Sequence, residues 1–178
     1  MSPRSTFSIA RRVFATVVMS FLAAASASAG PRPATLLAWD TAALERARAG
    51  AAQRLGKPEC QRVLSDFTDA EGRTLLQNLE TWQLAAPDYL NVIRFVDGSS
   101  MRNCRQTSVQ LTTAPGLPAV YLCPAGLGVA GSRFAQTEIR NTSLAEFMLI
   151  HEMLHTLGLG ENPPSTFEIT EQVKKRCR

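Results

Sequence analysis

The spacing of apolar residues predicts helices in the first part of the chain. Residues 40–55 are rich in Ala, Leu, Arg and Glu and are soon followed by a glycine and a proline, which indicates a helix that ends there. A second helix is expected over residues 70–81, where three leucines form an apolar stripe. Thr68 or Asp69 can cap its first turn.

The pattern then changes to that of strands. Residues 89–96 are rich in β-forming side chains and are followed by an Asp-Gly turn signal. Apolar and polar residues alternate over 108–112, which predicts a half-exposed strand, and residues 119–123 form a short apolar strand. A glycine-rich loop follows over residues 124–131. A small mixed sheet packed on N-terminal helices gives an α+β fold class.

Two further helices are predicted near the C-terminus. Ser143, with a Glu three residues later, matches a capping box and opens a mostly apolar helix that ends at Gly158. Because this helix is apolar on most of its surface, we expect it to be buried. Ser165, again with a Glu at the third following position, predicts a last helix over residues 166–176.

The N-terminus has the three parts of a secretory signal peptide. Arginines precede an apolar run over residues 13–25, and Ala27-Ser28-Ala29 is an A-x-A cleavage signal. The run is too short to span a bilayer comfortably, which argues against a membrane anchor. A pair of adjacent arginines fits either twin-arginine or general export. We expect residues 1–29 to be a signal peptide, residues 30–178 to be one domain, and the protein to be secreted or periplasmic, without stable membrane insertion after cleavage.

Charge excludes one class of partner. The signal peptide holds three of the 19 basic residues, so the rest of the chain has 16 basic residues against 15 acidic ones. Without a basic run or basic-aromatic pattern, nucleic acid is not an expected partner.

All four cysteines lie outside the signal peptide. An even number of cysteines in an exported chain predicts two disulfides. Of the three possible pairings, we expect Cys104–Cys123 as a local link and Cys60–Cys177 as a clamp on the C-terminal segment. No C-x₂₋₄-C spacing occurs, which argues against a cysteine metal site.

Both histidines of the chain fall in one pentapeptide, His151-Glu152-Met153-Leu154-His155. Positions i and i+4 share one face of a helix, so the two imidazoles can bind one metal ion while Glu152 acts on a water bound to it. In a buried helix, unpaired histidine and glutamate side chains would be costly, and a metal removes that cost. Imidazole ligands with an open position for water fit one Zn²⁺ per chain.

The third ligand has to be a carboxylate, because no third histidine exists. Glu161, six residues after His155 and just past the glycine turn, is the preferred candidate. Glu168 is already explained as a capping-box partner but stays as the alternative. Glu171, one helical turn later, comes third.

The segment His151-Glu152-x-x-His155-x-x-Gly158-x-x-Glu161 resembles the active-site helix of the zincin metallopeptidases, and its glycine is spaced as in the metzincin branch. The resemblance covers about a dozen residues. It implies a zincin-like fold, with His151 and His155 as zinc ligands, Glu152 as the catalytic base and Gly158 as the turn that brings in the third ligand. Two features depart from the metzincin pattern: Glu stands where His or Asp is usual, and no Met-turn follows.

These residues together predict a secreted zinc metallopeptidase acting on a peptide or protein substrate, in which Glu152 assists attack by a metal-bound water. Tyr121, in a strand that could line the cleft, is a candidate partner for the oxyanion. The main alternative is a secreted binding or structural module whose zinc only holds the C-terminal segment. A third option is cleavage of cell-wall peptides. A groove beside an edge strand at the histidines would favour a peptidase.

Overall fold

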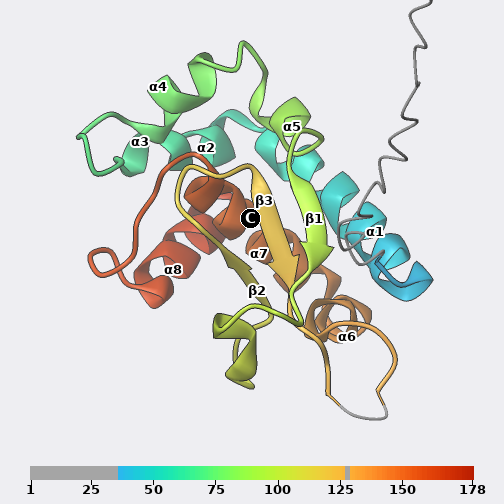
Figure 1. Cartoon of the computed structure of the whole chain (residues 1–178). Helices are drawn as coiled ribbons and strands as arrows, with labels where there is room; N and C mark the ends of the chain where they lie inside the picture. The colour runs from blue at the N-terminus through green and yellow to red at the C-terminus, as the bar shows by residue number, and fades with distance from the viewer. Residues whose placement is uncertain (1–35, 127–128) are drawn as a thin grey trace, which may run out of the picture. The chain divides into compact units, whose positions relative to one another are not determined.

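The computed structural model describes residues 36–126 and 129–178, which form an α+β fold with a three-stranded sheet (Figure 1). The predicted signal peptide, residues 1–29, lies outside the described residues. The elements follow one another as α1 (Ala38–Leu55), α2 (Pro58–Gln61), α3 (Val63–Asp66), α4 (Leu75–Glu80), α5 (Ala86–Tyr89), β1 (Arg94–Asp97), the 3₁₀ helix η1 (Asn103–Arg105), β2 (Leu111–Thr113), β3 (Ala119–Leu122), α6 (Arg133–Arg140), α7 (Thr142–Thr156) and α8 (Thr166–Arg176).

The sheet is mixed, as expected. Its order is β1-β3-β2, with β1 parallel to β3 and β2 antiparallel to it. The strands predicted over 108–112 and 119–123 are present, although β2 begins only at Leu111. The strand predicted over 89–96 begins at Arg94, because the residues before it form α5 with a proline in its first turn. Tyr89, the last residue of α5, has a fully buried side chain. Its packing in the core therefore outweighs the preference of tyrosine for strands.

The prediction of a helix over residues 70–81 is wrong for its first half, since the helix begins only at Leu75. The Asp69 carboxylate accepts hydrogen bonds from the backbone N–H groups of Glu71 and Arg73, which holds this segment in a turn. The helix α4 therefore starts only at Leu75, with Thr74 as its N-cap in a capping box. The expected caps, Thr68 and Asp69, do not cap it.

Only one of the two predicted capping boxes forms. Ser165 caps α8 as expected, and the Glu168 carboxylate accepts a hydrogen bond from the backbone N–H of Ser165. The helix α7 is capped by Asn141 instead of Ser143. Ser143 and Glu146 both bind the guanidinium group of Arg54 from α1, and the Glu146 contact is 2.6 Å long. An ion pair between helices thus replaces the local cap.

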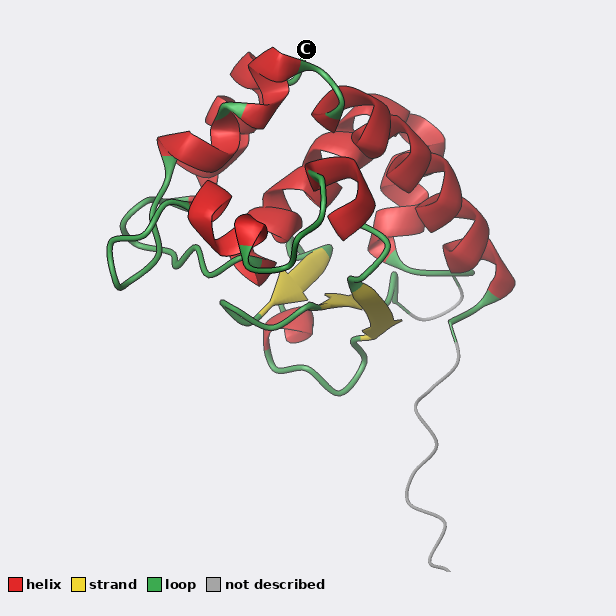
Figure 2. Cartoon of the chain, turned by 90° about the horizontal axis from the view of Figure 1, so that it is seen from above, coloured by secondary structure: helices red, strands yellow, loops and turns green. Residues whose placement is uncertain are grey.

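The helix α7 is the centre of the fold. It packs against α1, α6 and α8 and against strands β2 and β3, and each residue from 149 to 156 is buried. Figure 2 shows the long helices gathered on one side of the small sheet. The predicted burial of this helix is confirmed, and its two histidines lie where the helices and the sheet meet.

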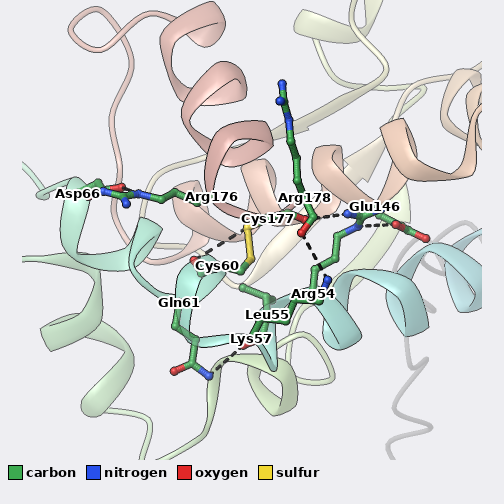
Figure 3. The surroundings of a disulfide bond; sticks show 10 residues. All are labelled: Arg54, Leu55, Lys57, Cys60, Gln61, Asp66, Glu146, Arg176, Cys177 and Arg178. Atoms are coloured by element: carbon green, nitrogen blue, oxygen red, sulfur yellow. Dashed lines mark hydrogen bonds and ion pairs between the residues drawn. A yellow bond between two sulfur atoms is a disulfide. The ribbon is translucent and has the colours of Figure 1, made fainter.

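Both predicted disulfides are present. Cys60 joins Cys177 across 117 residues, and Cys104 joins Cys123 across 19. The first of them ties α2 to the end of α8 (Figure 3). Two disulfides indicate an extracellular or otherwise oxidising environment. Within residues 36–126 and 129–178, none of the helices has the length and apolar character that a membrane crossing requires.

Candidate metal centre

Three of the predicted site residues meet at one point. The Nε2 atoms of His151 and His155 are 3.1 Å apart on one face of α7. Oε1 of Glu161 lies 3.4 Å from Nε2 of His155 and 3.9 Å from Nε2 of His151. A point equidistant from these three atoms is about 2.0 Å from each, which matches Zn–N and Zn–O bond lengths. The group could therefore hold a metal ion.

The two alternative carboxylates are engaged elsewhere. Glu168 accepts hydrogen bonds from the backbone N–H and the hydroxyl of Ser165 in the capping box. Glu171 pairs with Lys174 on the surface of α8, at 2.9 Å. Of the three candidates that the sequence offers, the structure brings only Glu161 to the histidines.

A tight turn after α7 places Glu161 near the two histidines. Gly158 has a φ of 111°, a value that favours glycine, and its N–H and that of Leu159 bond back to carbonyls of α7. A Cβ at Gly158 would also lie 3.2 Å from the Cβ of Asp69, so both conformation and space call for glycine. The predicted role of Gly158 as the stop of the helix is confirmed.

The same turn fixes the tautomer of the His155 imidazole. Its Nδ1 lies 2.7 Å from the carbonyl oxygen of Leu159. A carbonyl can only accept, so Nδ1 carries the hydrogen and Nε2 keeps its lone pair free. This is the form in which an imidazole binds a metal through Nε2.

Burial shifts the pKa values of His151 and Glu152. It lowers the pKa of His151 to about 4, with a further contribution from His155, while Glu161 acts in the opposite direction. His151 is therefore neutral near pH 7, as a metal ligand has to be. Burial, and then the negative charge of Glu161, raise the pKa of Glu152 to about 8. This carboxyl group can exchange a proton near neutral pH.

Glu152 has a buried oxygen without a partner. Its Oε2 atom is fully buried and has no hydrogen bond within the described residues. The residue is 9 % exposed and lies in the wall of a cavity that also contains His151 and His155. A buried acceptor without a partner is costly unless a ligand, an ion or water meets it. Like the candidate ligands, Glu152 faces the cavity.

The cavity lies between α7 and an edge of the sheet. It has a volume of about 720 Å³ and is bounded by the motif residues on one side and by β2 with the preceding loop on the other. Eight uncharged polar side chains contribute to its wall: Asn103, Gln106, Ser108, Gln110, Thr112, Thr113, Thr166 and Thr170. Tyr121 is not among the lining residues, and Tyr89 bonds to the carbonyl of Thr156 from the core. The arrangement gives no support to Tyr121 as an oxyanion partner.

Two threonines that the sequence analysis missed touch the candidate ligands. Thr170 Oγ1 lies 3.1 Å from Nδ1 of His151, and Thr166 Oγ1 donates to Oε1 of Glu161 at 2.6 Å. Both threonines belong to α8. Their spacing of four residues is common in any helix, so the sequence holds no signal that singles them out.

A buried polar group holds the end of α7 from the other side. The Asn78 amide donates to the carbonyl of Leu157 and to Asp69, each at 2.8 Å. The Asn78 contact, together with hydrogen bonds from Arg73, lowers the pKa of Asp69 to about 2. The exit of the motif helix is thus fixed by side chains from the turn before α4.

This low pKa predicts how acid affects stability. Because the folded-state pKa lies below the ordinary 3.8, the contribution of Asp69 is complete above about pH 4 and is lost as the pH falls towards 2. We expect Asp69→Asn to lower the free energy of unfolding at pH 7, by an amount that shrinks below about pH 4. Urea unfolding at several pH values measures this, with Glu71→Gln in the same turn as the control. A loss for Asp69→Asn that does not depend on pH would contradict the prediction.

Comparison with protein-family models, with curated proteins and with solved structures finds no match for this chain.

Proposed function

We propose that the protein is a secreted zinc-dependent metallopeptidase with a zincin-like site, in which His151, His155 and Glu161 hold the metal and Glu152 is the general base. One observation carries the proposal: the three candidate ligands and the unpartnered carboxylate of Glu152 face the same cavity as the free edge of a strand. A metal cluster, a proton acceptor and a surface for an extended chain are the three parts that peptide hydrolysis needs.

The edge strand offers backbone groups to a substrate. Cys123 N–H donates to the carbonyl of Gln110, so Gln110 and, by alternation, Thr112 direct their backbone groups towards β3. The backbone groups of Leu111 and Thr113 consequently point to the other side of β2, where the described sheet has no further strand. An extended peptide can pair with these groups and pass the histidines, since both lie in the wall of the same cavity.

The number of candidate ligands favours catalysis over a purely structural site. Structural zinc sites are closed by four protein ligands, whereas catalytic sites keep one position open. Among the described residues, the cluster consists of three groups. A zinc ion held there would supply a Lewis acid for the scissile carbonyl and would increase the acidity of water.

Glu152 would move the proton. It adjoins His151 in the chain and lines the same cavity, and its Oε2 has no hydrogen-bond partner among the described residues. Burial, and then the negative charge of Glu161, raise the pKa of Glu152 to about 8, so a minority of the group is ionised near neutral pH. This ionised form can take a proton from water and pass it to the leaving amine. The Leu159 carbonyl keeps the His155 ring oriented while the proton moves, because the Leu159 N–H is bonded to the end of α7.

Metal analysis tests the site. We expect the purified protein to contain about one zinc per chain, as for a single site of this type. Glu161→Ala should reduce zinc affinity strongly, and Glu168→Ala should leave it near the wild-type value because Glu168 only caps α8. Elemental analysis and chelator competition measure both. Wild-type protein that binds no zinc refutes the metal centre, and a larger loss for Glu168→Ala would move the third ligand to α8.

A further inference from the structure

The helix α8 supplies a polar partner for two of the three candidate ligands. Thr166 donates to Glu161 at 2.6 Å, and Thr170 Oγ1 lies 3.1 Å from Nδ1 of His151. The two threonines are one helical turn apart and both line the cavity, so they lie on the same face of α8. With the Leu159 carbonyl behind His155, each group of the cluster has one contact that orients it.

We propose that Thr166 and Thr170 are positioning residues of the metal centre: Thr170 sets the tautomer and rotation of the His151 ring, and Thr166 holds the Glu161 carboxylate towards the histidines. The inference rests on the proposed metal site. It assigns to α8 a role in metal affinity, although this helix contributes no ligand of its own.

The contact at His151 fits metal binding through Nε2. When Nε2 is a ligand, the ring hydrogen sits on Nδ1 and is donated to the Thr170 hydroxyl. Without an acceptor at that place, the buried Nδ1–H group would have no partner, and the ring could rotate or change tautomer. Groups of this kind behind a ligating histidine commonly change metal affinity by about 10–100-fold.

The contact at Glu161 limits a mobile side chain. The side chain of Glu161 is 41 % exposed and extends from a loop, so holding one rotamer costs entropy. A hydrogen bond from Thr166 restricts that freedom before a metal binds. A carboxylate oxygen has lone pairs for both a hydroxyl donor and a metal, so the two interactions are compatible.

The helix α8 is itself firmly placed. Ile169 and Val173 are fully buried in the core. At its C-terminal end, Cys177 is bonded to Cys60 and its carbonyl accepts a hydrogen bond from Arg54 at 2.7 Å (Figure 3). Residues that orient a site work best on rigid elements, and α8 is held by both its buried face and its end.

Zinc affinity of hydroxyl-deleted variants tests the proposal. Thr170→Val and Thr166→Val keep the shape of the side chain and remove the hydroxyl. We expect each to weaken zinc binding about tenfold or more, measured by competition with a chromophoric chelator at pH 7. Thr41→Val is the matched control, since the Thr41 hydroxyl on α1 donates to the carbonyl of Leu37 and not to a candidate ligand. Its zinc affinity should equal that of the wild type.

Two further measurements separate positioning from folding. Thr170→Ser retains the hydroxyl and should recover most of the affinity that Thr170→Val loses. The absorption spectrum of the Co²⁺-substituted protein should shift in Thr170→Val and not in Thr41→Val. Circular dichroism checks that every variant is folded.

The outcomes are distinct. If the wild type binds zinc and both valine variants bind it equally well, the positioning role is wrong while the metal centre stands. If Thr170→Ser loses as much affinity as Thr170→Val, the hydroxyl is not the active group and the proposal is also wrong. If the wild type itself binds no zinc, the proposed function fails and this inference fails with it.

Discussion

Glu152→Gln should leave zinc bound and reduce peptide hydrolysis by about 10²–10⁴-fold, the usual contribution of a positioned general base. Glutamine keeps the shape of the side chain but cannot take up a proton. The ligands His151 and His155 are not changed, and their contacts to Thr170 and Leu159 do not involve Glu152. Turnover of a general peptide library, together with zinc content, measures both effects.

The same substitution should not destabilise the fold. Burial raises the pKa of Glu152 to about 8, so the charged carboxylate is disfavoured in the folded protein, and a neutral amide avoids that penalty. We therefore expect the variant to unfold at the same temperature as the wild type or above it. Glu168→Gln is the matched control, because that carboxylate lies in a capping box away from the histidines. Unchanged hydrolysis in Glu152→Gln would remove Glu152 from the role of base.

Sequence reasoning locates the cluster because its signal is local. His151 and His155 are related by helical periodicity, and Gly158 and Glu161 follow within one turn and one loop. Such spacing translates directly into proximity, since the conformation of a buried apolar helix and of its glycine stop is known in advance. The disulfide pairing was also predicted, from the short span of one pair and the terminal position of one cysteine.

Contacts between distant segments were beyond sequence reasoning. Glu146 has a serine at capping-box distance, yet it pairs with Arg54, which lies 92 residues earlier. Asp69 resembles a helix cap but closes a turn and holds Asn78 against the end of α7. Each of these side chains has a local and a distant way to satisfy its hydrogen bonds, and tertiary packing decides between them. The roles of Thr166 and Thr170 are hidden for the same reason.

The helix α6 was missed entirely. Its eight residues are amphipathic and follow the N-cap residue Ser132, but only three of their side chains are apolar, and the segment was passed over. Its Glu138 is nevertheless buried and accepts two hydrogen bonds from Arg46 of α1, at 2.6 and 3.0 Å. A buried charge with its partner on another helix leaves no periodic mark in the sequence, which explains the omission.

Removal of the Cys60–Cys177 disulfide should cost more stability than removal of Cys104–Cys123. Cross-links act mainly on the unfolded chain, and the entropy that they remove grows with loop length. For separations of 117 and 19 residues, this relation gives about 5 and about 3 kcal/mol. Loss of either amount is a large part of the stability of a domain of this size. Urea unfolding of the two double-alanine variants measures the difference.

Other contacts cannot replace the longer disulfide. The end of α8 is also held by Arg176 and Asp66, at 2.7 Å, but these side chains are 30 % and 21 % exposed, and surface ion pairs contribute about 0–1 kcal/mol (Figure 3). In Cys60→Ala/Cys177→Ala, α8 should therefore separate more readily from the core and carry Thr166 and Thr170 away from the candidate ligands. Zinc affinity should fall in this variant and not in Cys104→Ala/Cys123→Ala. A larger loss of stability and zinc affinity in the second variant would contradict both the loop-length account and the role given to α8.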